Sequence, residues 1–306
     1  MNAANKYIRF DWAVKRMLRD KANFAVLEGL VTVLLGQPIH IMEILESEGN
    51  QESDIDKYNR VDIKAKNQKG EIILVEVQLT RQLHYLERIL YGVSKAITEH
   101  ISLGQPYSEV KKVYSISIVY FDLGQGSDYL YHGTTSFVGV HTHDTLTISS
   151  KEQDTIKMKT PEEVFPEYFI IRINNFNDVA KTPIEEWIDY LKNGHIKDDT
   201  TTPGLSEARE KLLYMAMNDQ DRRDYEHHMG AIVEQADVLN TAKLEGLAEG
   251  REKGLAEGRE EGLAEGLAEG RAEGVASVAR NLKAMGLSPE EVAKATGLSL
   301  DQLASL

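Results

Sequence analysis

Hydrophobic and polar positions alternate along two neighbouring stretches of the chain, residues 59–66 and 71–79. This alternation, together with the β-branched residues in both stretches, predicts two strands, and the short polar link 67–70 predicts a β-hairpin. Successive side chains of a strand point to opposite faces, so Glu76 and Gln78 lie on the same face. Apolar residues share that face, so we expect it to serve both core packing and chemistry.

The position of Gly70 determines the register that we expect for this hairpin. With Gly70 in the left-handed conformation, Asn67 pairs with Glu71. Counting outward from that pair places Asp62 directly opposite Glu76. Two carboxylates in such a position repel each other unless a cation lies between them, which favours a metal site. A solvated polar face is the alternative.

The remaining pattern predicts an α/β domain. Helical periodicity and capping signals mark several segments, and runs of β-branched and aromatic residues mark others. The expected helices are 11–19, 24–35, 81–101 and 183–193, and the expected further strands are 111–121, 129–140, 146–148 and 168–173. A helix between strands implies a βαβ crossover, so we expect a mixed sheet flanked by helices.

The pattern becomes helical and polar from Ser206 onward and repetitive from Leu244. Glycine then recurs at every fourth position, at 246, 250, 254, 258, 262, 266, 270 and 274. Each glycine costs a helix about 1 kcal/mol relative to alanine, so something must compensate for it. A step of four residues turns the helix by about 400°, which gathers the glycines into a drifting stripe that another helix can approach closely. We expect a homo-oligomer formed through this stripe; a flexible acidic tether is the alternative.

The end of the chain predicts a small helical hairpin. Capping boxes begin at Ser288 and Ser299, and Gly297 separates the two helices. The spacing is that of a helix-turn-helix, but Lys294 is the only basic residue, which makes a poor reader of DNA. A capping or oligomerisation element is therefore the preferred interpretation.

These patterns divide the chain into an α/β domain (1–200), a helical connector (201–243) and an all-α region (244–306). The formal net charge of −14 taken alone argues against nucleic acid as a partner. However, residues 1–150 carry 16 Lys plus Arg against 18 Asp plus Glu, whereas residues 151–306 carry 19 against 31. The chain has no cysteine, which excludes disulfides and thiolate nucleophiles. No apolar run is long enough to cross a bilayer, and we expect a cytoplasmic protein with no membrane partner.

Glu28 is a further candidate functional residue. It falls on the apolar stripe of the predicted helix 24–35, where a carboxylate is costly to bury unless it is paired or bound to a cation. A glutamate at the edge of the stripe that reaches water is the alternative.

The predicted helix 81–101 carries two kinds of stripe. Its apolar positions, which we expect in the core, are Leu83, Leu86, Leu90, Val93 and Ile97. Basic and aromatic side chains recur at three- and four-residue steps on another side, at Arg81, His84, Arg88, Tyr91 and Lys95. Such a stripe suits phosphate groups, and a solvated helix face is the alternative.

Glu28 on a helix, Asp62 on a strand and the segment 76–78 on the next strand, followed by a basic helix, resemble the PD-(D/E)XK nuclease superfamily. Within that superfamily, the chain resembles more closely the Rpn-type recombination-promoting nucleases, a transposase-like family. That closer resemblance rests on the Glu-x-Gln core, on the Arg-x-x-Tyr pattern of Arg88 and Tyr91, and on the C-terminal tail rich in Glu-Gly repeats. It covers nearly the whole chain.

The resemblance implies a divalent-metal-dependent DNA endonuclease connected with recombination or with defence against foreign DNA. By motif position, Asp62 and Glu76 are the implied metal ligands, and Glu28 is the helix acid that contacts the metal or its water. We expect the Val77 carbonyl to join them in holding Mg²⁺ or Mn²⁺, and Gln78 to orient the attacking water.

The DNA backbone is expected to meet the basic helix. Arg88 and Lys95 are the expected phosphate contacts, with Arg81 and Tyr91 beside them.

Two departures from the family pattern affect the expected chemistry. Val61 stands where relatives have proline, and Gln78 stands where many have lysine. A glutamine amide is neutral and can orient water only by hydrogen bonds, so more of the catalysis falls to the metal. The alternative function is a catalytically weak DNA-binding or assembly protein of transposase type that acts through its C-terminal helices.

Overall fold

The computed structural model describes residues 7–16, 18, 20–45, 62–101, 104–152, 155–213 and 217–306. The predicted strand residues 59–61, Val61 among them, lie outside these ranges. Contacts divide the chain into two compact units, Met1–Glu226 and His227–Leu306.

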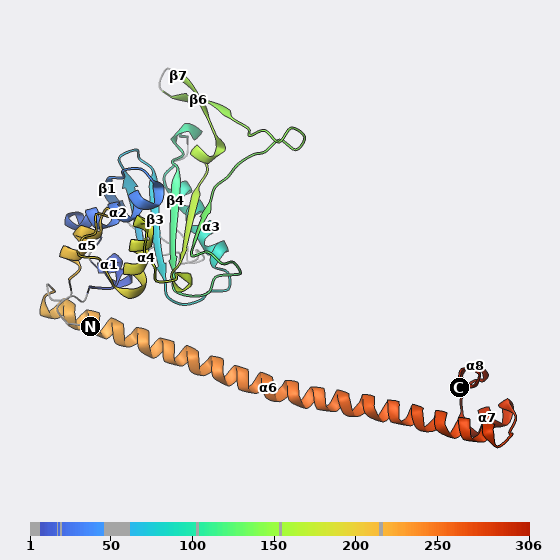
Figure 1. Cartoon of the computed structure of the whole chain (residues 1–306). Helices are drawn as coiled ribbons and strands as arrows, with labels where there is room; N and C mark the ends of the chain where they lie inside the picture. The colour runs from blue at the N-terminus through green and yellow to red at the C-terminus, as the bar shows by residue number, and fades with distance from the viewer. Residues whose placement is uncertain are drawn as a thin grey trace. The chain divides into compact units, whose positions relative to one another are not determined.

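A mixed β-sheet forms the centre of the N-terminal unit (Figure 1). Its strands, in spatial order, are β1 (Ile41–Leu45), β2 (Ile63–Asn67), β3 (Ile72–Gln78), β4 (Val113–Val119), β8 (Glu167–Arg172) and β5 (Leu130–Gly133). The pairs β3–β4 and β4–β8 are parallel, whereas β1–β2, β2–β3 and β5–β8 are antiparallel. A separate two-stranded sheet pairs β6 (Ile148–Glu152) with β7 (Thr155–Lys159). The expected mixed sheet is therefore confirmed.

Helices cover both faces of this sheet. The helices of the N-terminal unit are α1 (Phe10–Arg16), α2 (Phe24–Leu35), α3 (Tyr85–Glu99), α4 (Pro183–Asn193) and α5 (Leu205–Lys211), with 3₁₀ turns η2 (Lys21–Asn23), η3 (Tyr107–Glu109), η4 (Pro161–Glu163) and η5 (Ile173–Asn175). Figure 1 shows α3 on one side of the sheet and α1, α2, α4 and α5 on the other. The central strand β4 is buried along its whole length, as expected for a parallel strand covered on both faces.

The β2–β3 hairpin has the predicted register. Gly70 adopts a positive φ of 76°, and the Asn67 amide donates to the Glu71 carbonyl at 3.1 Å. Ile63 pairs with Val75, so the next position outward places Asp62 opposite Glu76. The side chains of Asp62 and Glu76 therefore belong to the sheet face that α3 covers.

The orientation of α3 agrees with the sequence prediction only in part: Val93 is buried and Ile97 packs against the core as expected, whereas the other three predicted core positions are exposed. The helix begins at Tyr85, and Leu83, Leu86 and Leu90 are 85%, 57% and 58% exposed. Its buried residues are Tyr85, Ile89, Gly92, Val93 and Ala96. The side of α3 that is turned inward is the one from which Arg88 reaches the buried Glu76 carboxylate on the sheet.

Two predicted strands have different bounds in the structure. The strand expected over residues 129–140 is limited to β5, whose pairing with β8 ends at Gly133 opposite Tyr168. The strand expected over residues 146–148 begins at Ile148 as β6.

The C-terminal unit consists of most of the helix α6 (Asp219–Ala284), then α7 (Pro289–Thr296) and α8 (Leu300–Ala304). A long Gly-repeat helix was expected and is confirmed. Ala279, Val292 and Leu303 form a small apolar cluster at its end, and the predicted capping boxes at Ser288 and Ser299 are both formed.

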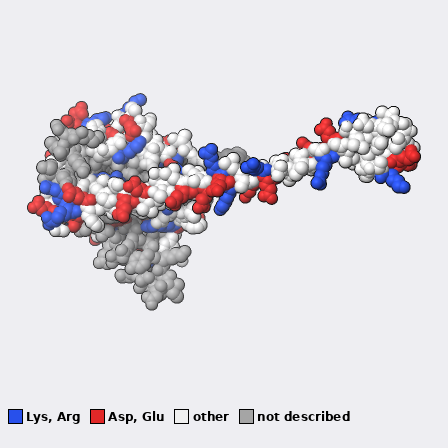
Figure 2. All heavy atoms as spheres, turned by 90° about the horizontal axis from the view of Figure 1, so that it is seen from below, with Lys and Arg blue, Asp and Glu red and all other residues white. Residues whose placement is uncertain are grey.

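The repeat part of α6 is exposed. The glycines from Gly246 to Gly274 have no atoms of other segments within 4 Å of the position a Cβ would take, within the part of the chain that the structure describes. Leu247, Leu255 and Leu263 are exposed, and acidic and basic side chains are interspersed along the helix (Figure 2). None of the helices in the described ranges has both the length and the apolar character needed to span a lipid bilayer.

Candidate metal and nucleic-acid site

Asp62 and Glu76 meet at the open end of the β2–β3 hairpin. Asp62 immediately precedes β2, and its Oδ2 accepts a hydrogen bond of 2.7 Å from the Val77 amide. This bond continues the pairing of the two strands by one step and holds the Asp62 carboxylate against β3. The hairpin turn, at the other end of both strands, thereby determines which two carboxylates are neighbours.

Glu76 is buried, with only 6% of its surface exposed. Its Oε1 lies 2.6 Å from Nη2 of Arg88 on α3, but this oxygen has no partner in hydrogen-bond geometry among the described residues. Burial raises the pKa of Glu76 to about 7; Arg88 acts in the opposite sense and lowers it, and the neighbouring Asp62 raises it further. The site therefore holds a carboxylate for which the neighbouring cation, Arg88, only partly offsets the cost of burial.

Gln78 lies at the end of β3 on the same face. Its amide nitrogen donates to the carbonyl and the hydroxyl of Thr80, at 3.2 and 3.3 Å. Its backbone carbonyl accepts from the Tyr120 amide, which ties the end of β3 to the end of β4. The amide group is thus held in place beside the carboxylates.

The side chains of the predicted basic stripe differ in their surroundings: some are paired with carboxylates and others are exposed. Arg88 is directed at Glu76, whereas Lys95 is mostly buried and lies 4.0 Å from Glu99. Glu99 is also paired with Lys64 of β2. Arg81 precedes the helix and is exposed, and Tyr91 is 38% exposed. Arg81 is therefore the accessible cation of the set, and Arg88 belongs to the carboxylate cluster.

Glu28 is not brought to this cluster. Its Oε1 accepts a hydrogen bond of 2.7 Å from the amide of Ile41, the first residue of β1, and Ile41 pairs with Asn67 at the turn end of the hairpin. Asp62 lies five residues before Asn67, just beyond the opposite end of β2, roughly 17 Å away at the usual strand rise. The apolar stripe of α2 correctly marked Glu28 as a half-buried carboxylate that needs a partner, but that partner is a backbone amide.

The structure adds two residues that the sequence did not single out. Ser117 of β4 is the parallel neighbour of Glu76 and is buried, and Tyr85, one helical turn before Arg88, is 1% exposed. The spacing of Tyr85 and Arg88 places both side chains on one face of α3 and was available from the sequence. The register of β3 against β4, which selects Ser117, was not.

A family model for the PD-(D/E)XK nuclease family transposases matches residues 8–242. The chain belongs to this family. No curated protein and no solved structure matches it. Membership supports a nuclease-type function and implies DNA as the substrate, and nucleases of this superfamily generally use divalent metals.

The residues present fit a divalent metal. Hard cations such as Mg²⁺ prefer oxygen ligands and are commonly held by one or two carboxylates together with waters and phosphate oxygens. Asp62 and Glu76 supply two carboxylates, and the Glu76 Oε1 is a buried oxygen that lacks a hydrogen bond in the described structure. Within the described ranges, no group of three or more His, Cys, Asp or Glu side chains could hold a metal ion. Asp62 and Glu76 are therefore a pair of candidate ligands and not a complete metal-binding cluster.

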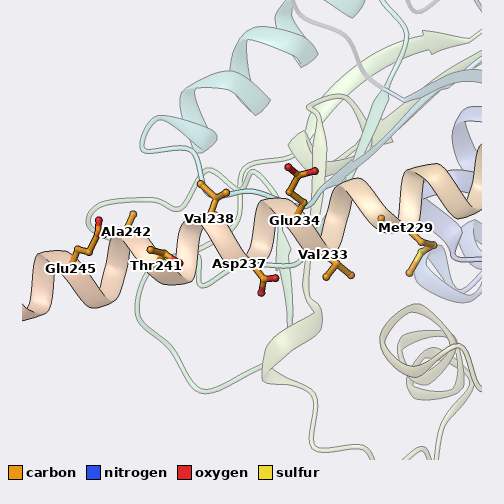
Figure 3. Close-up of a pocket in the computed structure, with 9 residues that line it drawn as sticks. Met229, Val233, Glu234, Asp237, Val238, Thr241, Ala242 and Glu245 are labelled. Carbon is orange, nitrogen blue, oxygen red and sulfur yellow. The ribbon is translucent and has the colours of Figure 1, made fainter.

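A surface hollow lies along α6, in a part of the sequence far from Asp62 and Glu76. It is lined by Met229, Gly230, Val233, Glu234, Asp237, Val238, Thr241, Ala242 and Glu245. Figure 3 shows the carboxylates of Glu234 and Asp237 pointing to different sides of the helix, so they do not converge on one ligand. This surface does not have the features of a nuclease site.

Proposed function

We propose that this member of the family is a divalent-metal-dependent DNA endonuclease, with Asp62 and Glu76 as the metal ligands. The observation that carries the proposal is the pairing of these two carboxylates across β2 and β3, with the Glu76 Oε1 buried and not hydrogen-bonded in the described structure. Carboxylates in directly opposite positions destabilise a sheet. A cation between them removes that cost.

The Val77 carbonyl is proposed as a third oxygen ligand. In an antiparallel ladder the N–H and C=O of one residue point to the same neighbouring strand. The Val77 amide donates to Asp62, so its carbonyl faces the same side of β3. Bound there, Mg²⁺ or Mn²⁺ lowers the pKa of a coordinated water and stabilises the charge that develops on the scissile phosphate.

Gln78 is proposed to orient the attacking water. Its side-chain amide is fixed by Thr80 and lies two residues beyond Glu76 on the same face of β3. A neutral amide neither adds charge to the site nor accepts the proton of the water. Gln78 therefore acts through geometry alone, which makes it less important to the rate than either carboxylate.

DNA is proposed to cross the α3 side of the sheet. Arg81 and Tyr91 are exposed there and available to a phosphate and to a base or sugar. Arg88 and Lys95 are paired with Glu76 and Glu99 and contribute positive charge behind that surface. A cytoplasmic role in recombination or in defence against foreign DNA, such as phage DNA, is the context that we propose.

We also propose that copies of the chain associate through α6. None of Arg251, Arg259 and Arg271 has a carboxylate three or four positions away in the sequence, so none can form the usual ion pair along its own helix. The row from Glu257 to Glu273, with glutamate at every fourth position, repels itself. These charges are compensated when the arginines of one helix meet the glutamates of another.

The exposure of α6 favours a second candidate function. A catalytically weak DNA-binding or assembly protein would need the same helix for association and would tolerate glutamine at position 78. Activity distinguishes this candidate from the nuclease.

A plasmid-nicking assay tests the proposed nuclease. Purified protein is expected to nick supercoiled plasmid with Mg²⁺ or Mn²⁺ and not with EDTA. Asp62→Ala and Glu76→Ala are expected to reduce nicking by about 100-fold or more, because each removes a ligand of the catalytic metal. Glu28→Ala is the matched acid control and should retain most activity. Nicking that survives both ligand substitutions would contradict the assignment.

A further inference from the structure

The hydroxyl of Tyr85 is an anomaly in the core of the N-terminal unit. Tyr85 is 1% exposed, and its hydroxyl lies close to the Ser117 side chain but makes no hydrogen bond of ordinary geometry with any residue that the structure describes. A buried hydroxyl without a partner costs folding free energy, whereas a phenylalanine of the same shape does not. The presence of tyrosine at this position is therefore explained if its hydroxyl gains a hydrogen bond when a ligand binds to the folded protein.

The position of Tyr85 limits what that partner can be. Its ring packs with Val119 and Phe121 at the end of β4, edge-on to Phe121 with ring centroids 5.6 Å apart. Val119 is the parallel neighbour of Gln78. The side chain of Arg88, one helical turn farther along α3, contacts Glu76. The hydroxyl thus lies among the groups of the proposed metal site.

The electrostatics agree with this placement. Burial raises the pKa of the Tyr85 hydroxyl, and ionised Glu76 and Asp62 raise it further, while the charge of Arg88 and a side-chain interaction with Ser117 lower it, so all four residues are near the hydroxyl. A tyrosine hydroxyl is protonated at neutral pH and can serve as a donor. One acceptor without a hydrogen bond belongs to the same cluster: Oε1 of Glu76 is buried and lacks hydrogen-bond geometry even toward Arg88, whose Nη2 is 2.6 Å away.

We propose that Tyr85 is a positioning residue for Glu76: when Glu76 turns from Arg88 to hold a divalent cation, the Tyr85 hydroxyl donates to its carboxylate and fixes the ligand. The inference rests on the proposed function, because it requires Glu76 to bind metal. Ligating carboxylates are commonly held by such donors, and loss of the donor typically weakens metal binding by about 10- to 100-fold. Without metal, the hydroxyl does not form this hydrogen bond to Glu76.

A matched pair of Tyr→Phe substitutions in the full chain tests this. Tyr85→Phe removes an unpartnered hydroxyl. Tyr190→Phe removes an equally buried one that donates to the Ile8 carbonyl at 2.7 Å. Each variant is examined by thermal unfolding without metal and by calorimetric titration with Mn²⁺ alone.

The two variants are expected to behave in opposite ways. Tyr85→Phe should leave the metal-free Tm unchanged or slightly higher and weaken Mn²⁺ binding by about 10-fold or more. Tyr190→Phe should lower the metal-free Tm by about 2–4 °C and leave Mn²⁺ affinity unchanged.

Two results would overturn the inference. One is Mn²⁺ affinity in Tyr85→Phe equal to that of the wild type. The other is a metal-free Tm lowered as far as in Tyr190→Phe, since the hydroxyl would then already have a partner in the folded protein. A wild-type chain that binds no Mn²⁺ contradicts the proposed function itself, whereas normal wild-type binding with an unaffected Tyr85→Phe contradicts this inference alone.

Discussion

The β2–β3 hairpin and the repeat helix α6 differ in the burial of their charged side chains. In the hairpin, Glu76 is 6% exposed and lies against Arg88, and the Asp62 carboxylate accepts the Val77 amide. In the repeat, residues 244–274 carry nine glutamates against four Lys plus Arg, all on an exposed helix. The first region compensates its charges within the chain, except for one carboxylate oxygen. The second exposes its charged side chains to solvent.

This difference separates what each region needs in order to function. Charges buried at a cost within a folded unit are concentrated at functional sites, which fits the metal-binding role that we propose for the hairpin. Charges and glycines on an exposed helix cost less to place but give no stability of their own, and the association that we propose for α6 would compensate for them. Measurements on the hairpin should therefore respond to metal, and measurements on α6 should respond to protein concentration.

The strongest stability effect is expected where α3 covers the hairpin face. Ile89 is buried and its neighbour Leu90 is 58% exposed. Ile89→Ala should lower the free energy of unfolding by about 2–4 kcal/mol, because it leaves a cavity between α3 and the sheet. Leu90→Ala should change it by less than about 0.5 kcal/mol. Urea denaturation of both variants measures this, and equal effects would contradict the orientation of α3.

A pH effect of similar or smaller size is expected from Glu76. Burial raises its pKa from 4.5 to about 7, so folding favours the protonated acid. The resulting stability is complete below pH 4.5 and is lost as the pH rises through about 7. In metal-free buffer the wild type should lose at most about 3 kcal/mol relative to Glu76→Gln over this window. Parallel pH profiles of unfolding free energy would show that Glu76 is not a costly buried carboxylate.

The hairpin and α3 differ in how far their structures could be predicted from the sequence. The hairpin register followed from Gly70 and the alternation of side chains, because a short turn leaves few ways to pair two strands. The same reasoning oriented α3 only in part, because the predicted apolar stripe did not include Ile89 or Tyr85 and the sequence does not show that Arg88 meets a buried carboxylate on the sheet. The choice between Leu90 and Ile89 depended on Arg88 and its distant partner Glu76.

The candidate site was predictable only in part for the same reason. The neighbourhood of Asp62 and Glu76 is local to one hairpin. By contrast, Glu28 was recognised as a carboxylate needing a partner, but amphipathic periodicity does not say whether that partner is a metal or the Ile41 amide. Ser117 required the parallel register of β3 and β4, which depends on a long crossover and not on a turn.

The smallest effect per residue is expected in α6. Gly254, Gly258 and Gly262 changed together to alanine add about 1 kcal/mol of helix propensity each, yet their methyl groups keep a second helix at a distance. We expect the mass in solution, measured by light scattering at several concentrations, to fall. Ala256, Ala264 and Ala268 changed to serine add one heavy atom per site away from the stripe and serve as the control. An unchanged mass in the glycine variant would favour the tether.

The most direct test of the account is calorimetric titration with Mn²⁺ at about pH 8, where Glu76 is expected to be largely ionised. The wild type and Glu28→Gln should bind with equal affinity, whereas Asp62→Asn and Glu76→Gln should each bind about 100-fold more weakly or not at all. A loss in Glu28→Gln as large as in Glu76→Gln, or unchanged binding in both hairpin variants, would show that the paired carboxylates of β2 and β3 are not the metal site.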